Sequence, residues 1–157
     1  MWAAPEHAEV LAALHGLSFP RPWQASEFEV LLRQPGVTGI LAMENAAPTG
    51  FILLRAAADE AEILTLAVAP EHCRRGTASR LLQEAGARLH QAHVARWFLE
   101  VAADNVAARA LYTRRGFTDC GQRPNYYSRP PAQAAIDAIV MMRPLDGDRG
   151  NSGAGEI

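Results

Sequence analysis

The chain has 157 residues, 49 % of them hydrophobic and 20 % charged, which is typical of one globular domain with a sizeable core. Its formal net charge of −2 predicts no general electrostatic attraction to nucleic acid or to an anionic membrane. The start lacks the basic segment and apolar run of a secretion signal, and no apolar stretch approaches the ~20 residues that span a bilayer, so we expect a cytoplasmic protein without a membrane partner.

Two helices are predicted at the start of the chain. Apolar residues between Val10 and Leu17 recur at helical spacing. Gly16 and the segment Pro20–Pro22 are expected to end this first helix, because proline cannot continue one. A second, short helix is predicted over Ser26–Arg33, with its first serine as the cap and with Pro35 directly beyond its end.

Three strands follow the helices. The runs Val37–Met43, Gly50–Ala56 and Glu62–Val68 are rich in apolar and β-branched residues. The segments between these runs are short and carry turn residues, as antiparallel hairpins require. The first half of the sheet is therefore predicted to be antiparallel.

The pattern then alternates between helix and strand. A long amphipathic helix is predicted over Arg75–Gln91, followed by an apolar strand, Trp97–Val101, that we expect to be covered on both faces. The next helix covers about Ala108–Arg115, and either Asp104 or Asn105 can cap its start. Each of these elements is short enough to belong to one layered domain.

The fold class expected from this order is α/β. Two final strands, Phe117–Gln122 and Ala134–Arg143, complete a mixed central sheet flanked by about four helices, with one parallel pair at its centre where a helix connects two strands. We assign one domain to residues 1–145. Residues 146–157 hold four glycines and almost no apolar side chain, so we expect a disordered tail.

Cysteine and histidine usage gives no sign of a metal site or of a disulfide. Cys73 and Cys120 lack any spacing suited to zinc, and two cysteines are too few for a disulfide framework. We expect reduced thiols that pack as small, semi-buried side chains. The five histidines are interpreted as surface or helix residues without a catalytic role; they are His7, His15, His72, His90 and His93.

A possible phosphate-binding turn lies between the third strand and the long helix. A helix start presents unpaired N–H groups and a positive dipole end, which together bind an anion. Gly76 and Ala78 would let phosphate oxygens approach this backbone, and Arg74 and Arg75 add positive charge. The alternative is an ordinary helix cap beside two solvated arginines. The Lys-Ser/Thr pair of a P-loop and the three-glycine dinucleotide fingerprint are both missing.

The segment Leu66–Ala78 resembles the coenzyme A motif of the GNAT acetyltransferase superfamily, Gln/Arg-Xaa-Xaa-Gly-Xaa-Gly/Ala. Cys73 departs from this motif at its first position, which we expect to weaken cofactor binding slightly. The resemblance implies that acetyl-CoA is the co-substrate, that backbone amides hold its pyrophosphate and that the strand before them pairs with the pantetheine arm. The cofactor-binding residues implied are Leu66, Ala67, Val68, Arg74, Arg75, Gly76, Thr77, Ala78 and Ser79.

Acetylation of an amine needs a base and an acid, because the ammonium must lose a proton and the leaving thiolate gains one. Glu100 is the candidate base: it lies late in an apolar strand, where burial would make it a better base. A rim glutamate that faces water is the alternative. Tyr112 is the candidate acid on the apolar stripe of the next helix, and an ordinary core tyrosine is the alternative there.

A second resemblance connects these residues. Leu99–Val101, Asn105 and Ala110–Phe117 resemble the RimI branch of the superfamily, enzymes that acetylate the N-terminal alanine of a small-subunit ribosomal protein. The resemblance implies a glutamate base at Glu100, a cofactor contact at Asn105 and a tyrosine acid at Tyr112. Further similar segments are Pro22–Trp23, Arg123–Tyr127, into which this chain inserts Pro124, and Asp137–Met141.

The predicted function is therefore direct transfer of an acetyl group from acetyl-CoA to the N-terminal α-amine of a protein, without a metal. A backbone N–H near Val68 is expected to steady the oxyanion. The segment Asn125–Tyr127 either lines the peptide groove or packs over the sheet edge. Other possibilities are a lysine or small-amine acceptor, transfer through Cys73 or Cys120, and a non-catalytic coenzyme A-binding module.

Overall fold

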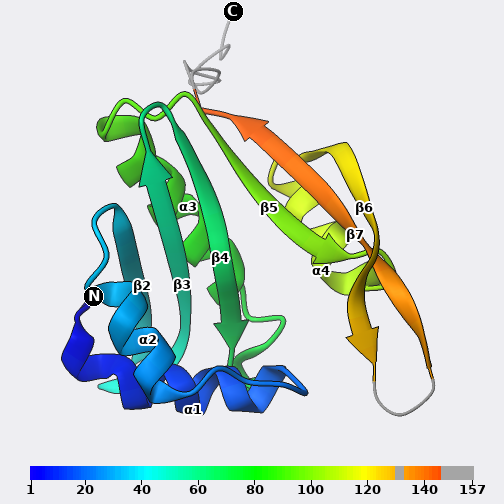
Figure 1. Cartoon of the computed structure of the whole chain (residues 1–157). Coiled ribbons are helices and arrows are strands. Elements are labelled where there is room, and N and C mark those ends of the chain that lie inside the picture. Colours follow the sequence, from blue (N-terminus) through cyan, green and yellow to red (C-terminus); the bar gives the residue numbers. More distant parts are fainter. Residues whose placement is uncertain (130–132, 146–157) are drawn as a thin grey trace, which may run out of the picture.

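The computed structural model describes residues 1–129 and 133–145, which form one mixed sheet with helices on both faces (Figure 1). The strands are β1 (Trp2–Ala3), β2 (Val37–Glu44), β3 (Ala47–Ala57), β4 (Glu60–Val68), β5 (Arg96–Ala102), β6 (Thr118–Arg129) and β7 (Gln133–Pro144). The α-helices are α1 (Ala8–Ser18), α2 (Ala25–Leu32), α3 (Thr77–Gln91) and α4 (Val106–Arg114). This order confirms the predicted sequence of elements and adds β1 at the start.

The seven strands lie in the order β1-β2-β3-β4-β5-β7-β6. Only β4 and β5 are parallel neighbours, and all other neighbouring pairs are antiparallel. Helix α3 connects the two parallel strands, as a parallel pair requires. The predicted mixed sheet with one parallel pair at its centre is confirmed.

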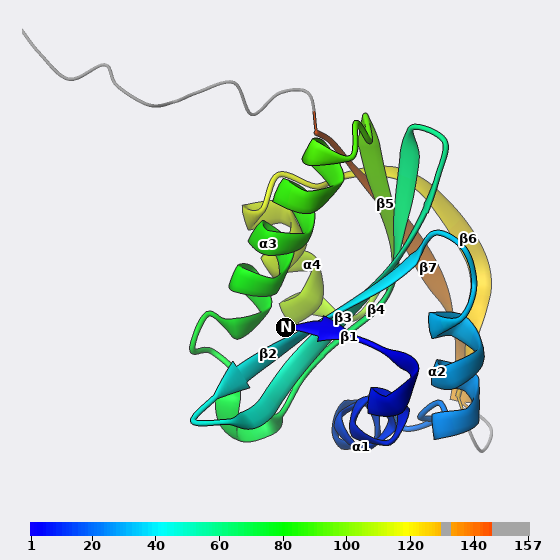
Figure 2. The ribbon, with the colours of Figure 1, turned by 90° about the vertical axis from the view of Figure 1, so that its left-hand side faces the viewer.

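Two hydrophobic layers hold the helices against the sheet, and Figure 2 shows α3 and α4 on one face with α1 and α2 on the other. The first layer packs α3 and α4 around Trp97, which is fully buried. The second packs α1 and α2 around Phe28 and Phe51, whose rings meet edge to face at 5.6 Å between centroids. Each face of the sheet therefore has its own core.

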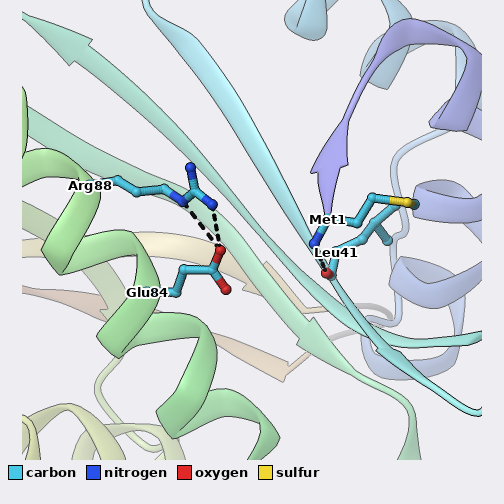
Figure 3. Close-up of polar contacts among 4 residues, drawn as sticks. All are labelled: Met1, Leu41, Glu84 and Arg88. Carbon is cyan, nitrogen blue, oxygen red and sulfur yellow. Dashed lines mark hydrogen bonds and ion pairs between the residues drawn. The ribbon is translucent and has the colours of Figure 1, made fainter.

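The short strand β1 extends the sheet at its β2 edge and was not predicted from the sequence. The Met1 nitrogen donates to the Leu41 carbonyl at 2.9 Å, and the Leu41 N–H donates back to the Met1 carbonyl at 2.7 Å (Figure 3). Beside it, the Arg88 guanidinium pairs with Glu84 at 2.7 Å (Figure 3) and lies 3.9 Å from the Trp2 ring centroid. Two residues carry too little periodicity for a strand to be recognised.

Helix α1 runs through Gly16 to Ser18, so the prediction that Gly16 ends it was wrong. A glycine inside a helix costs only about 1 kcal/mol relative to alanine and need not stop it. The prediction from the prolines was correct, because Phe19 is extended (φ −122°, ψ 135°) and directly precedes Pro20. A residue before proline is pushed out of the helical region.

Two other predicted helix starts needed correction. Helix α2 begins at Ala25, and Gln24 precedes it with its N–H donating to the Glu27 carboxylate at 2.8 Å; Ser26 lies inside the helix. Helix α3 begins at Thr77 because Gly76 has a φ of 79°, a left-handed conformation that no helix continues through. At α4 the choice left open is settled: Asn105 is the cap, and its side chain accepts from the Ala108 N–H.

The cysteines differ from their predicted environment, since Cys73 and Cys120 are both exposed rather than semi-buried. Cys73 lies in the connection between β4 and α3, and Cys120 lies on the edge strand β6. The local sequence does not reveal that these positions are exposed to solvent. The predicted tail, residues 146–157, lies outside the described residues.

Candidate functional site

A groove of about 1170 Å³ opens where the central strands β4 and β5 separate. The two strands pair only from Glu60 to Glu62 on β4 and from Arg96 to Phe98 on β5. Beyond these pairs they diverge toward their carboxyl ends (Figure 1). The main-chain groups of β4 from Ile63 onward thus have a strand partner only on the β3 side.

A β-bulge in β4 changes which side chains face each side of the sheet. Leu53 pairs with Thr65 whereas Leu54 pairs with Ile63, so Leu64 is an extra residue on β4. Before the bulge Ile63 packs in the core on the α3–α4 face, and after it Leu66 packs there; Thr65, between them in sequence, points to the opposite face. The bulge therefore reverses the alternation of side chains along β4, so that Thr65 points to the α1–α2 face and Leu66 to the α3–α4 face.

Strand β5 supplies Glu100 to this groove. Alternate residues of β5, namely Trp97, Leu99 and Val101, are buried in the core against α3 and α4. Glu100 lies between them in the alternation, so its side chain points to the α1–α2 face of the sheet. The prediction that β5 is covered on both faces was wrong, because the second face of its carboxyl half borders the groove.

The surroundings of the Glu100 carboxylate differ from the apolar burial that the strand suggested. Its side chain is 27 % exposed, and one carboxylate oxygen lies 3.1 Å from Nε of Arg123. The guanidinium of Arg123 in turn lies 5.6 Å from the ring centroid of Tyr126, which also lines the groove. Glu100 is thus partly exposed and paired with Arg123 at the edge of the groove.

Arg123 and Tyr126 owe their placement to an irregular stretch of β6. Arg123 pairs with Ala138, but Tyr127 pairs with Ile136, so three residues of β6 face one residue of β7. The Asp137 carboxylate accepts the Asn125 N–H at 2.8 Å and also the Gln122 side chain amide. Pro124, the residue inserted relative to the similar segment of RimI proteins, lies inside this bulge. Its missing N–H therefore removes no hydrogen bond between β6 and β7.

Tyr112 reaches the groove from the other face of the sheet. It lies on α4, is 8 % exposed and belongs to the core on the α3–α4 face. Its ring meets Phe117 edge to face at 5.8 Å between centroids. Asn105, the cap of α4, lines the groove beside it. The structure therefore brings Glu100, Asn105 and Tyr112 to one groove.

The predicted phosphate-binding residues lie past the carboxyl end of β4, at the start of α3. The first helical bond of α3 runs from the Arg80 N–H to the Gly76 carbonyl at 2.9 Å. The N–H groups of the three residues between them, 77–79, precede it and have no partner within the helix. A Cβ added at Gly76 would meet nothing within 4 Å, so the turn is open on its outer side. An anion fits such a helix start.

Other residues predicted to hold the cofactor contribute in different ways. Arg74 and Arg75 are exposed, whereas Thr77 is buried and its hydroxyl accepts from the Arg80 guanidinium at 3.5 Å. Cys73, at the departing position of the motif, points its sulfur at the Val68 carbonyl at 3.7 Å. Of the three β4 residues, Leu66 lines the groove, while Ala67 and Val68 are buried in opposite cores.

The connection between α1 and α2 forms the wall of the groove opposite β5. His15 is 3 % exposed, and its Nδ1 accepts the Trp23 N–H at 3.0 Å. Its ring stacks on Phe19 at 4.1 Å and on Trp23 at 5.1 Å between centroids. Burial lowers the pKa of His15 to about 4, although Glu27 partly opposes that shift. His15 is helical, as predicted, but it is a buried residue that holds this wall in place.

The described part of the chain contains no group of three or more histidine, cysteine or acidic side chains that could hold a metal ion. Within the same residues, no helix is long and apolar enough to cross a membrane.

Known proteins resemble this chain in sequence and in fold. Residues 8–117 match the acetyltransferase (GNAT) family. The ribosomal protein bS18-alanine N-acetyltransferase of Escherichia coli strain K12 is 36 % identical over 102 residues, which are 65 % of this chain and 68 % of that protein. The crystal structure of the ribosomal-protein-S18-alanine N-acetyltransferase from Escherichia coli superposes with a TM-score of 0.84 at 28 % identity, covering 99 % of this chain and 96 % of that one. A chain of the NatC complex bound to Gag peptide and CoA shares the fold at 20 % identity, with a TM-score of 0.77 over 92 % of this chain and 97 % of that one.

Proposed function

Because the chain belongs to the acetyltransferase (GNAT) family and is an acetyl-CoA-dependent N-acetyltransferase, we propose that its acceptor is the N-terminal α-amine of a protein that begins with alanine. The names of its relatives support this acceptor, since the Escherichia coli relative is a ribosomal protein bS18-alanine N-acetyltransferase. We also propose that the protein partner is a small-subunit ribosomal protein, that the reaction takes place in the cytoplasm and that the acetyltransferase domain spans residues 1–145.

The observation that carries the proposal is the gap between β4 and β5, which is open to both faces of the sheet. Glu100 and Arg123 border it on the α1–α2 face, and Tyr112 and Asn105 border it from the α3–α4 face. An amine that enters from one face and a thioester that enters from the other would meet between one carboxylate and one phenol. Direct transfer needs this arrangement, because both reactants must be held together.

The cofactor would bind from the α3–α4 face of the sheet. Acetyl-CoA supplies the acetyl group as a thioester. The N–H groups of residues 77–79 at the start of α3, with the open turn at Gly76, would hold its pyrophosphate, and Arg74 and Arg75 would add charge. The backbone of Leu66–Val68 would pair with the pantetheine arm along the side of β4 that β5 leaves free. Asn105 would contact the cofactor from the start of α4.

The placement of the side chains supports two proton transfers. Glu100 takes a proton from the acceptor ammonium, directly or through a water, and leaves an amine that can attack. A main-chain N–H near Val68 donates to the thioester carbonyl oxygen. Tyr112 donates its phenolic proton to the departing sulfur. Direct transfer of this kind uses neither Cys73 nor Cys120.

The test is acetyl-CoA turnover with a synthetic Ala-start peptide, followed by mass spectrometry that locates the acetyl group. We expect acetylation of the α-amine only, with a peptide of the same sequence blocked at its N-terminus as the control. The Glu100→Gln variant should lose turnover by a factor of about 10²–10⁴, the range of general base catalysis. Acetylation of a lysine side chain would replace the proposed acceptor, and binding of acetyl-CoA without turnover of any amine would refute catalysis.

A further inference from the structure

The hydroxyl group of Thr65 is buried and has no hydrogen-bond partner among the described residues. Thr65 is 8 % exposed and lines the groove between β4 and β5. Buried polar atoms in folded proteins nearly always have a partner, since leaving one unpaired is destabilising. Each exception needs an explanation, and a ligand that is absent from the free protein is one.

Other buried threonines in the described residues are paired. The Thr49 hydroxyl donates to the Ala42 carbonyl at 3.3 Å, and the Thr77 hydroxyl accepts from the Arg80 guanidinium at 3.5 Å. Both residues are 3 % exposed, so they are buried at least as deeply as Thr65. The sequence therefore satisfies buried threonines elsewhere in the fold. The hydroxyl that borders the groove is the one left without a protein partner.

The position of Thr65 relates this hydroxyl to the acceptor. Thr65 directly follows the bulge residue Leu64, on the part of β4 that no longer pairs with β5. Its side chain points to the α1–α2 face, the face onto which Glu100 also points from β5. The wall formed by His15 and its stacked aromatic rings lines the same groove. Thr65 and Glu100 thus flank the opening through which an amine would approach.

We infer that Thr65 is a positioning residue for the acceptor, whose primary amine donates a hydrogen bond to Oγ1 of Thr65. The inference rests on the proposed function, because it places the amine beside Glu100. After Glu100 takes one proton from the ammonium, the neutral amine keeps two N–H groups. One of them is lost as the amide forms, and its proton replaces the one that Tyr112 gives to the departing sulfur. The other remains in the product amide, and this is the N–H that Thr65 holds throughout the reaction.

This assignment has a consequence for the class of acceptor. A secondary amine, such as an N-methylalanine terminus, keeps a single N–H after deprotonation and loses it when the amide forms. It therefore has no N–H left to donate to Thr65 at the end of the transfer. The hydroxyl should favour primary over secondary amines, and removing it should erase that part of the preference.

The experiment compares Thr65→Val, which keeps the shape and loses the hydroxyl, with Thr65→Ser, which keeps the hydroxyl. For an Ala-start peptide we expect kcat/KM to fall about tenfold or more in Thr65→Val and to stay within about twofold in Thr65→Ser. For the same peptide with an N-methylalanine start, both variants should match the unsubstituted enzyme. The Kd for acetyl-CoA should not change, because the cofactor approaches from the other face.

Thermal unfolding separates this role from a structural one. Since Thr65→Val removes an unpaired buried hydroxyl, its Tm should be unchanged or higher by about 2–4 °C. The matched control is Thr49→Val, which removes a paired hydroxyl outside the groove; its Tm should fall while its kcat/KM for the Ala-start peptide stays the same.

Four outcomes would overturn the assignment. Undiminished kcat/KM in Thr65→Val would mean that the hydroxyl does not hold the acceptor. An equal loss in Thr65→Val and Thr65→Ser, or an equal loss with both peptides, would indicate a change of packing instead of a lost hydrogen bond. An unsubstituted enzyme that fails to acetylate the Ala-start peptide would overturn the proposed acceptor and this assignment together. The other outcomes would overturn the assignment of Thr65 alone, so the two failures can be distinguished.

Discussion

At the scale of single residues, the proposed base and the proposed acid differ in how their surroundings hold them. Glu100 is partly exposed and paired with Arg123, whereas Tyr112 is buried and packed against Phe117. A partly exposed carboxylate can exchange a proton with water between turnovers. A buried phenol is held in one orientation by its packing, which suits a group that must meet one sulfur atom.

The acid role gives the first prediction. Replacing Tyr112 with phenylalanine keeps the ring and its contact with Phe117 but removes the proton donor. We expect kcat to fall by a factor of about 10² or more, the range of general acid catalysis, with less than a twofold change in the Kd of acetyl-CoA. Steady-state kinetics and isothermal calorimetry measure these two quantities. Unchanged kcat would refute the role of Tyr112 as the acid.

The buried His15 gives a prediction for stability. Its pKa is lowered to about 4 in the fold, against 6.5 in the unfolded chain, so the unfolded state binds the extra proton first as the pH falls. The contribution of neutral, buried His15 to the free energy of unfolding is fully present above about pH 6.5 and is lost as the pH falls toward 4. At pH 5 the linkage relation gives a loss of about 2 kcal/mol relative to neutral pH.

The matched variant is His15→Asn, whose side chain oxygen can still accept the Trp23 N–H but does not titrate in this range. Urea unfolding between pH 7 and pH 4.5 should show a steeper loss of unfolding free energy in the unsubstituted protein than in the variant. Parallel curves for the two proteins would contradict the pKa assigned to His15.

Sequence reasoning identified those candidate residues whose type and position in the chain could be recognised. Glu100 stood out as an acid in an apolar strand, and Asn105 as a residue before a helix. Arg123 entered only as part of a segment similar to RimI proteins, and His15 only as one of five surface or helix histidines. Their contacts depend on partners that the folded sheet brings close. Thr65 could not be distinguished from any other strand threonine, since its missing partner is a property of the bulge and the groove.

At the scale of elements, the sequence predicted the existence and order of the helices and strands better than their ends. Gly16 and Gly76 show why. Both are glycines near a predicted helix boundary, but Gly16 lies inside α1 whereas Gly76 adopts a φ of 79° directly before α3. Amphipathic spacing identifies an element, and only the local backbone conformation decides where it stops.

These two glycines provide a matched pair of substitutions. Gly76→Ala places a Cβ on a left-handed residue, which should cost about 1–2 kcal/mol of unfolding free energy. The added methyl group lies at the open turn, so the Kd of acetyl-CoA should rise about tenfold. Gly16→Ala has its nearest new contact at 3.9 Å, on Pro22, and should instead raise stability by about 0.5–1 kcal/mol.

Urea unfolding and calorimetric titration with acetyl-CoA measure both effects. Gly16→Ala serves as the control, because it should leave the Kd unchanged. If Gly76→Ala bound acetyl-CoA as tightly as the unsubstituted protein, the start of α3 would not be the pyrophosphate site.

At the scale of the whole molecule, the gap between β4 and β5 depends on where along their length the two strands stop pairing. The crossover through α3 predicted that these strands are parallel neighbours, and this was correct. No feature of either strand alone revealed that the pairing covers only Glu60–Glu62 and Arg96–Phe98. The separation depends on how the two strands twist in the folded sheet, which the sequence of neither strand specifies by itself.

A gap open to both faces predicts the kinetic mechanism. Under the proposed function each reactant binds from its own face, so both can be bound at once and the acetyl group need not be stored on the protein. Initial rates measured against both substrates should therefore give intersecting reciprocal plots, the pattern of a ternary complex. Parallel plots would instead indicate a covalent acetyl-enzyme intermediate.

The two exposed thiols are the nucleophiles that could store the group. Cys73 lies beyond the end of β4 and Cys120 on β6, and neither lines the groove between Glu100 and Tyr112. Replacing both cysteines with serine should leave kcat within about twofold, because surface substitutions of this kind change little. A large loss of kcat together with parallel plots would indicate that a cysteine thiol carries the acetyl group. An intact kcat with intersecting plots would support direct transfer in the gap between β4 and β5.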